Sequence, residues 1–400
     1  MRRPNAILTA SLATLVLALA GCSKDAEQAP ASAAPAAEPG AAAPSPIPPP
    51  PELKARSYIV IDHDSGRVLA ALDPDSRQEP ASLTKVMTAY GVFRALKEGR
   101  IKLEDMVTIS EHAWKQEGSR MFVEVGKQVS VDNLIQGMIV QSGNDATVAL
   151  AEHVAGTEAT FVQMMNTYAK ELGMSGSHFM NSAGMPDPEH YTTARDSAIL
   201  ASALIREFPE YYRWYSQREF TWNGITQQNR NGLLWRDPTV DGVKTGHTET
   251  AGYCLVASAK REGMRLVSAV LGTESMRSRE DANAALLNYG FNFFETRRLY
   301  AAGEPLTTAR VWKGASPEVG LALRRDLFVT GQRGHVGSVK AEFALPDRLV
   351  APLAAQTPLG KVSIVVDGAT IATHDLYPAT EVPAGGLFRR AVDTVRLWFN

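Results

Sequence analysis

The hydrophobic positions of this chain predict strands on either side of a long helical stretch. Continuous apolar runs predict strands at residues 57–62 and 67–70, with a turn at Asp64-Ser65-Gly66 between them. Similar runs at residues 252–259 and 265–271 predict two further strands. We expect these four strands to share one sheet, although most of the intervening chain is helical.

Between the two pairs of strands, apolar residues recur at helical spacing up to about residue 207. One clear helical segment begins at Ser82 and runs through Leu96, and others cover residues 131–138, 145–154 and 160–172. Residues 278–294 are predicted to form a closing helix. The pattern predicts an α+β domain over residues 55–296, in which the terminal strands form the sheet and the helices form a block.

After residue 297 the pattern changes to short strands separated by turns. The predicted strands are 309–312, 327–330, 339–344, 362–366 and 370–374, and Asp367-Gly368 is a strong hairpin signal. Residues 297–384 are therefore predicted to form a small all-β domain, and they hold no cluster of residues typical of catalysis.

The last segment, residues 385–400, has the pattern of an amphipathic helix that follows Gly385-Gly386. Its apolar face carries Leu387, Phe388, Ala391, Val392, Val395, Trp398 and Phe399, and its polar face carries Arg389, Arg390, Asp393 and Arg396. A basic amphipathic helix with aromatic residues suits a membrane interface. The alternative is a helix that packs against the β domain.

The N-terminus has the pattern of an export signal at residues 1–21. Arg2 and Arg3 precede an apolar run that is short for a membrane span. The run ends in Leu19-Ala20-Gly21-Cys22, which is similar to a bacterial lipobox, so Cys22 is the expected lipidation site. The alternative is ordinary signal-peptidase cleavage after Ala20. Residues 22–54, rich in Ala and Pro, are predicted to be an extended tether.

Composition narrows the range of functions. The chain has 400 residues, 44% of them hydrophobic, and a net charge of −2, so it can form a large core and carries no basic excess typical of nucleic-acid binding. Histidines are scattered and no zinc motif or phosphate-binding glycine loop is present, so we expect no metal and no cofactor. Cys254, the only cysteine besides Cys22, is expected to be a small buried residue.

The first chemical motif is Ser82-Leu83-Thr84-Lys85. On a helix, the three-residue spacing places Ser82 and Lys85 on one face, one turn apart. A serine hydroxyl becomes a good nucleophile when a base removes its proton, and lysine can be that base when burial or a nearby positive charge lowers its pKa. We expect Lys244 to be the nearby charge. The alternative is a helix-capping serine with a solvated lysine.

Two further motifs complete the constellation. Ser142-Gly143-Asn144 precedes a helix, and Lys244-Thr245-Gly246-His247 precedes a predicted strand. In a functional interpretation, Ser142 relays a proton to the leaving amine and Asn144 donates to a substrate amide oxygen. The second motif forms an edge strand that pairs with an extended peptide. Each motif taken alone can equally be an ordinary turn.

Taken together, the three motifs resemble those of low-molecular-mass penicillin-binding proteins, the serine D-alanyl-D-alanine carboxypeptidases. The resemblance covers residue 55 to the end, including residues 229–235 and 241–271, the β domain and the amphipathic tail. It implies a transpeptidase/β-lactamase-like catalytic domain, a β-rich second domain and a C-terminal interfacial anchor. The stretch 114–121 is shorter than is usual in the family, so we expect the loop beside the cleft to differ.

The resemblance also implies a role for each motif residue. Ser82 is the acylated nucleophile, Lys85 its base, and Ser142 the third catalytic residue. The residues implied in substrate binding are Asn144, Lys244, Thr245, Gly246, His247, Arg230 and Arg279. For both arginines a structural salt bridge is an equal alternative. The backbone N–H groups of Ser82 and His247 are expected to form the oxyanion hole.

The expected function is a periplasmic serine carboxypeptidase that removes the terminal D-alanine from peptidoglycan stem peptides and is acylated by β-lactam antibiotics. Alternatives are a D,D-endopeptidase that cuts cross-links and a non-catalytic lipoprotein that tethers the wall. A β-lactamase is disfavoured because no Glu-x-x-Leu-Asn motif is present. Lipid on Cys22 and the tail helix predict attachment to a membrane surface. Ser23 favours the outer membrane, but the tail leaves inner or outer membrane open.

Overall fold

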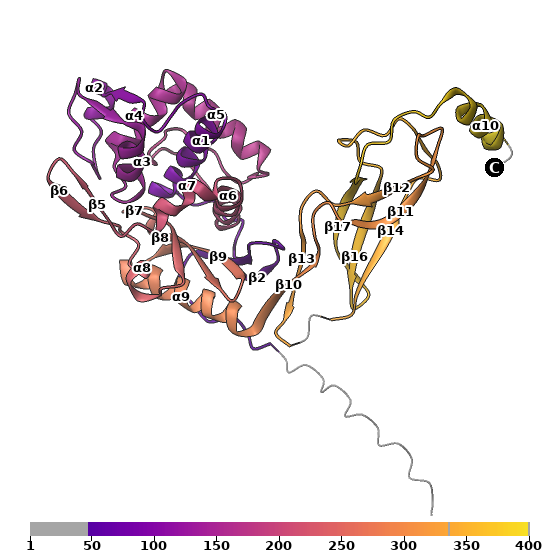
Figure 1. The fold of residues 1–400 in the computed structure, drawn as a ribbon. Coiled ribbons are helices and arrows are strands. Elements are labelled where there is room, and N and C mark those ends of the chain that lie inside the picture. The colour runs from indigo at the N-terminus through magenta and orange to yellow at the C-terminus, as the bar shows by residue number, and fades with distance from the viewer. Residues whose placement is uncertain (1–46, 335–336, 399–400) are drawn as a thin grey trace, which may run out of the picture. The chain divides into compact units, whose positions relative to one another are not determined.

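The computed structural model describes residues 47–334 and 337–398. Its central element is a five-stranded antiparallel sheet in the order β2-β1-β9-β8-β7 (Figure 1). The strands are β1 (Ser57–Asp62), β2 (Val68–Leu72), β7 (Val240–Thr248), β8 (Gly252–Arg261) and β9 (Met264–Thr273). The predicted α+β class is confirmed: strands from both ends of the domain share one sheet, and β7 is one of its edges.

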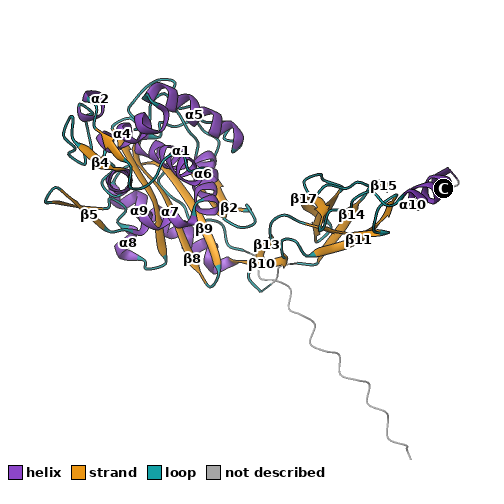
Figure 2. Ribbon diagram, turned by 45° about the horizontal axis from the view of Figure 1, so that its top comes forward, coloured by secondary structure: helices purple, strands orange, loops and turns teal. Residues whose placement is uncertain are grey.

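Both faces of this sheet are covered, which is why its strands read as continuous apolar runs rather than alternating ones. Ile59 and Ile61 of β1 point into the core formed with the helical block, while Tyr58 and Val60 point into a second core. The second core includes Leu286 of helix α9 (Met276–Phe293), which lies on the opposite face from the helical block (Figure 2).

The helical block connects β2 to β7. Its longer members are α1 (Lys85–Lys97), α3 (Val131–Ile139), α4 (Asn144–Ala155), α5 (Glu158–Glu171) and α6 (Ala194–Glu207). Its shorter members are 3-10 turn η1 (Ala81–Thr84), α2 (Glu111–Trp114), α7 (Pro209–Tyr212) and 3-10 turn η2 (Arg213–Ser216). Helix α8 (Leu233–Arg236) belongs instead to the second core, with α9. Side-chain caps begin several of the helices, because Ser130, Thr157 and Thr193 each accept a backbone N–H from the first turn.

Two small hairpins, absent from the sequence-based prediction, lie within this block. They are β3 (Met106–Thr108) with β4 (Gln128–Ser130), and β5 (Glu219–Trp222) with β6 (Ile225–Gln228). Three-residue strands carry too little hydrophobic pattern to be recognised, and β6 is mostly exposed. The first hairpin brackets the loop beside the cleft, so it affects the site described below.

The C-terminal part is rich in β-structure, as predicted. It contains a six-stranded sheet in the order β14-β16-β17-β12-β11-β15, and a pair formed by β10 and β13. The strands are β10 (Phe294–Tyr300), β11 (Pro305–Trp312), β12 (Glu318–Ala322), β13 (Leu327–Gln332), β14 (Val339–Ala344), β15 (Leu349–Val350), β16 (Gly360–Val366) and β17 (Ala369–Pro378). Val319, Leu321, Val362, Ile364 and Leu376 are central to its core.

The chain closes with helix α10 (Leu387–Trp398), which follows the predicted segment closely. Its polar side lies toward the β-structure: Asp393 is buried and accepts the backbone N–H of Lys313 at 2.7 Å. Its apolar side is open, with Leu387, Phe388 and Trp398 each more than 80% exposed. The helix therefore does contact the β-structure, but not through its hydrophobic face.

The features predicted for the N-terminus lie partly outside the residues that the structure describes. The signal at residues 1–21, Cys22 and residues 22–46 of the tether lie outside the described residues. Residues 47–54, also assigned to the tether, lie against the catalytic domain: Ile47 and Leu53 pack on the core shared with α9, and Tyr289 donates its hydroxyl to the Pro48 carbonyl at 3.1 Å. None of the helices in the described ranges has both the length and the apolar content needed to cross a membrane.

One glycine controls how the nucleophile segment packs. Gly184 has φ +86°, and a Cβ there would lie 1.8 Å from the carbonyl oxygen of Ala81. Gly184→Ala should therefore lower the free energy of unfolding by about 2 to 4 kcal/mol, from backbone strain and overpacking together. Urea denaturation measures the loss.

Gly224→Ala is the matched control, because Gly224 has φ +77° with no atom within 4 Å of an added Cβ. The free energy of unfolding of Gly224→Ala should fall only by the cost of a positive φ for alanine, about 1 kcal/mol. Equal losses in the two variants would show that contact with Ala81 contributes nothing.

Candidate active site

Ser82 and Lys85 lie next to each other where η1 passes into α1. The Lys85 Nζ and Ser82 Oγ atoms are 2.9 Å apart. Because η1 continues directly into α1, the side chains at positions 82 and 85 meet on one side of a single turn. This contact confirms the predicted geometry and excludes a solvated Lys85, which is only 1% exposed.

Every hydrogen-bond partner of the Lys85 amine is neutral. Besides Ser82 Oγ, these are Asn144 Oδ1 at 2.7 Å and the carbonyl oxygen of Ala183 at 2.6 Å. Within the described residues, no carboxylate lies within 4 Å of the Lys85 amine. Burial, followed by repulsion from Arg230, lowers the pKa of Lys85 to about 7.

These three neutral oxygen atoms can also be hydrogen-bond partners of an uncharged lysine amine. A neutral amine keeps two N–H groups and one lone pair. The two N–H groups can donate to Asn144 and Ala183, which leaves the lone pair to accept the proton of the Ser82 hydroxyl. Lys85 can therefore remove that proton without moving.

Ser142 lies in the turn between α3 and α4, in a backbone conformation that aims its side chain into the cleft. Its φ is +65°, rare for a residue with a Cβ, and its Oγ is buried without a hydrogen-bond partner among the described residues. Strain and an unpaired buried hydroxyl often mark functional positions. The cleft is thus lined by a second serine, whose hydroxyl has no partner among the described residues.

Asn144 begins helix α4 and links the base to the cleft wall. Its Oδ1 accepts from Lys85, and its Nδ2 donates to the carbonyl oxygen of Glu117 at 2.5 Å and lies 3.6 Å from Met185 Sδ. Donation to a substrate amide oxygen, as predicted, therefore requires one of these contacts to open. In this structure, Asn144 orients Lys85.

Asp145 is a site residue that the sequence reasoning missed. Its fully buried carboxylate accepts backbone N–H groups of Met121 and Phe122 at 2.8 Å and of Val123 at 3.2 Å. These bonds hold the loop that passes over the cleft against the start of α4. The only signal in the sequence was an acidic residue directly after the Ser-Gly-Asn motif, at a helix N-terminus.

The third motif lies on β7, an edge strand of the sheet as the structure describes it, although Lys244, Thr245 and Gly246 are buried. Thr245, Gly246 and His247 of β7 line the cleft, and their strand pairs only with β8. A Cβ at Gly246 would lie 2.9 Å from the carbonyl oxygen of Pro80, so the glycine makes room for the segment before Ser82. The His247 ring stacks on Tyr253, with centroids 4.0 Å apart.

Lys244 is buried, and its role in the electrostatics differs from the prediction. Its amine donates to the carbonyl oxygen of Thr245 at 3.3 Å. Burial, and then repulsion from Lys85, Arg230 and Arg279, holds the pKa of Lys244 well below its usual range. After burial, the charge that lowers the pKa of Lys85 is that of Arg230, which the sequence reasoning had not assigned to this role.

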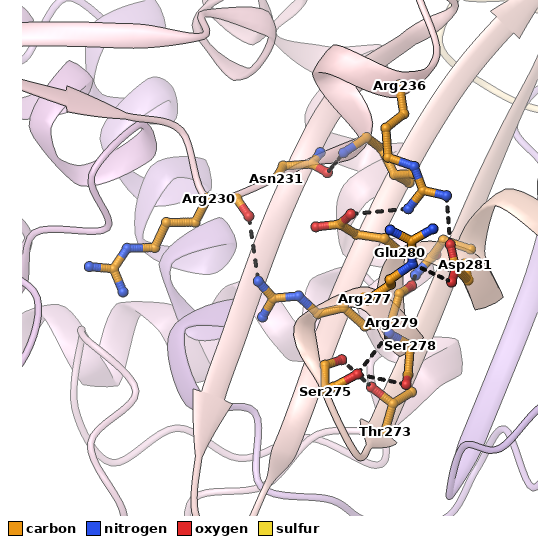
Figure 3. Close-up of polar contacts among 12 residues, drawn as sticks. Arg230, Asn231, Arg236, Thr273, Ser275, Arg277, Ser278, Arg279, Glu280 and Asp281 are labelled. Carbon is orange, nitrogen blue, oxygen red and sulfur yellow. Dashed lines mark hydrogen bonds and ion pairs between the residues drawn. The ribbon is translucent and has the colours of Figure 1, made fainter.

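Arg230 and Arg279 both line the cleft, and neither makes an ion pair in residues 47–334 and 337–398. Arg279 is 3% exposed and donates to two carbonyl oxygens, those of Gly246 at 3.2 Å and Arg230 at 3.4 Å (Figure 3). Burial lowers the pKa of both guanidinium groups. Two unpaired cations beside an open cleft are suited to bind an anion, and the salt-bridge alternative does not hold.

The cleft has a volume of about 730 Å³ and brings most of the predicted residues together. Those on its wall are Ser82, Ser142, Asn144, Thr245, Gly246, His247, Arg230 and Arg279, while Lys85 and Lys244 lie beneath them. Sequence reasoning missed the wall residues Ser119, Met185, Pro186, Tyr253 and Met276, which belong to loops or lie outside any motif.

The comparisons with known proteins agree with this geometry. Residues 44–275 match the Peptidase S11 family, described as D-alanyl-D-alanine carboxypeptidase. The chain belongs to this family. It is a serine D-alanyl-D-alanine carboxypeptidase of the penicillin-binding protein group. Residues 294–384 match the C-terminal domain of penicillin-binding protein 5, so the carboxypeptidase carries both parts of that architecture.

Individual relatives are similar over most of the carboxypeptidase chain. D-alanyl-D-alanine carboxypeptidase DacA from Haemophilus influenzae is 45% identical over 350 residues, which are 86% of this chain and 89% of that protein. The crystal structure of penicillin binding protein 5 from the same species is similar with a TM-score of 0.76, at 46% identity, and covers 84% of this chain and 99% of that one. Penicillin-binding protein D2 from Listeria monocytogenes, solved in an ampicillin-bound form, has a TM-score of 0.57 at 29% identity and covers 61% of this chain and 100% of that one.

The low pKa of Lys85 predicts a pH profile for acylation. Below pH 7 the lysine is charged and cannot accept the serine proton, so the rate constant for acylation by a fluorescent penicillin should rise with pH around a midpoint near 7. Lys85→Met should reduce it about 10²- to 10⁴-fold.

Arg230→Gln tests the assigned cause, because removal of a positive charge raises the pKa of Lys85 and should move the midpoint to higher pH. Arg277→Gln is the control, since Arg277 is 83% exposed and is not among the charges that act on Lys85. Identical midpoints in all three proteins would refute the role of Arg230.

Proposed function

We propose that Ser82 attacks the carbonyl carbon of the terminal D-Ala–D-Ala bond of a peptidoglycan stem peptide. The observation that carries this proposal is the Ser82–Lys85 contact of 2.9 Å at a buried lysine whose partners are all neutral. As the Oγ–carbon bond forms, Lys85 takes the hydroxyl proton. As the peptide C–N bond breaks, a proton passes to the leaving amine through Ser142, and D-alanine departs.

The second half of the reaction is hydrolysis of the acyl-enzyme. A water molecule gives its proton to the same base and attacks the ester carbon, which restores the Ser82 hydroxyl and releases the shortened peptide. A β-lactam ring opens in the same first step and leaves an acyl group on Ser82. The Listeria protein with bound ampicillin supports this reading of the relationship to penicillins.

The edge strand β7 is suited to hold the substrate. Its free side can pair with the extended peptide. Thr245, with Arg230 and Arg279, provides donors for the terminal carboxylate, and the backbone N–H groups of Ser82 and His247 stabilise the oxyanion. A substrate with a free terminal carboxylate matches two cations that have no partner of their own, which favours a carboxypeptidase over a D,D-endopeptidase.

The test compares two substrates. The purified protein should release D-alanine from a pentapeptide faster than it cleaves a cross-linked dimer, and it should become labelled by fluorescent penicillin. Ser82→Ala should abolish release and labelling with its circular dichroism spectrum unchanged. A faster reaction on the dimer would assign the endopeptidase instead, and a folded protein with neither activity would assign the non-catalytic wall-tethering role.

We also propose that the protein acts in the periplasm, attached to a membrane at both ends. The support is the lipobox-like Cys22 at one end and, at the other, the open apolar side of α10 with the basic residues Arg389, Arg390 and Arg396. Asp393 and its bond to Lys313 hold the helix by its polar side. That attachment leaves Phe388 and Trp398 exposed to a bilayer surface.

Vesicle binding tests the helix separately from the lipid. In a Cys22→Ser background, which cannot be acylated, the protein should sediment with vesicles that contain anionic phospholipid. The double variant Phe388→Ser, Trp398→Ser should lose about tenfold or more of this affinity, since each aromatic side chain contributes over 1 kcal/mol of apolar burial.

Thr394→Ser is the matched control, because it changes the same helix without removing an aromatic side chain. If the double variant sediments as well as the control does, the helix is not an anchor. Lipid on Cys22 predicts in turn that a chain truncated after Gly386 stays membrane-bound in cells.

A further inference from the structure

The two arginines of the cleft wall are carried by different elements, so their separation depends on how those elements are joined. Arg230 belongs to the loop before α8, and Arg279 to the first turn of α9. Both guanidinium groups are positively charged and face one cleft, and the charge of Arg230 acts on Arg279. Without a bound anion, their repulsion favours a wider separation.

A bridge of ion pairs joins α8 directly to the first turns of α9, apart from the contacts that Arg261 makes with Asp237 and Asn288 farther along. Arg236, the last residue of α8, donates through one nitrogen to Glu280 at 3.1 Å and through another to Asp281 at 2.6 Å. Figure 3 shows Arg236 reaching over the start of α9, while the neighbouring Arg279 points to the backbone of Arg230. Glu280 directly follows Arg279, so the bridge holds the very turn that presents Arg279.

The contact under this bridge is unusually close. A Cβ at Gly232 would lie 2.3 Å from Oε1 of Glu280, so the carboxylate occupies the space that a side chain would take. Arg230 precedes Gly232 by two residues. The residue between them, Asn231, donates its side-chain amide to the carbonyl oxygen of Gly242 in β7 at 3.0 Å. The segment of Arg230 is therefore held to β7 on one side and to α9 on the other.

We propose that Arg236 is a positioning residue for the reaction: by bridging Glu280 and Asp281 it sets the separation of Arg230 and Arg279, and thereby the affinity for the carboxylate of the substrate. This inference rests on the proposed binding of that carboxylate by the two arginines. Arg236 touches no cleft atom and does not line the cleft. Its ion pairs are partly exposed, so they contribute little to folding stability.

The experiment measures KM and kcat for D-alanine release by Arg236→Met. KM should rise about 3- to 10-fold, toward the lower end of the coupling found between residues in one network, with kcat and the urea midpoint unchanged. Arg236→Lys should not restore KM, because a single ammonium cannot reproduce the two-pronged contact. Arg277→Met is the matched control: it removes an exposed cation from the same turn that also pairs with Asp281, and it should leave KM unchanged.

A double-mutant cycle with Arg279→Met separates positioning from a general effect. If Arg236 acts through Arg279, its substitution should change KM far less in the Arg279→Met background. An unchanged KM in Arg236→Met, an equal effect in both backgrounds, or a loss of kcat and stability together would each overturn the proposal.

Binding to the inactive protein keeps this test apart from that of the function. In a Ser82→Ala background, calorimetry with N-acetyl-D-alanyl-D-alanine should show the same 3- to 10-fold weakening on Arg236→Met. If the wild-type protein released no D-alanine, the proposed function would be refuted. The ratio of the Kd values of the Ser82→Ala proteins with and without Arg236→Met would still decide the role of Arg236. A ratio of one would refute that role.

Discussion

The active site depends on one costly arrangement, a lysine amine buried without a negative partner. Removing an ammonium group from water is unfavourable, so the protein can keep Lys85 in place only by making its neutral form accessible. Three neutral oxygen partners and a nearby arginine do this. The burial of Lys85 therefore lowers the stability of the fold but provides a base, and such opposition between stability and activity is common in enzymes.

Much of the surrounding structure shields the Lys85 amine from solvent and fixes its orientation. Asn144 holds Lys85, and Asp145 next to it holds the cleft loop through three backbone N–H groups. The two residues are consecutive, so one turn at the start of α4 fixes both the base and the wall beside it. A change in the loop can therefore reach the chemistry through two adjacent side chains.

The sequence was sufficient for features that depend on local spacing. The Ser82–Lys85 pair follows from helix geometry alone, and four of the five strands of the sheet, all but β7, follow from their continuous apolar runs. It was insufficient where a role depends on a distant partner. The pairing of Asp145 with residues 121–123 requires the loop to fold back, and the closeness of Gly246 to Pro80 joins segments 166 positions apart, so neither leaves a local pattern. The effect of Arg230 on the pKa of Lys85 was missed for the same reason, because the two residues are 145 positions apart.

The packing of Gly246 has a consequence for how this enzyme can change over generations. On the proposed mode of binding, substrate and penicillin use the same strand, so a mutation that crowds the strand is a conceivable way to exclude the drug. Any side chain at position 246 meets the carbonyl of Pro80 and pushes on the segment that carries Ser82. We therefore expect escape from the antibiotic by this route to disturb the nucleophile as well, and variation that spares activity to arise elsewhere on the cleft wall.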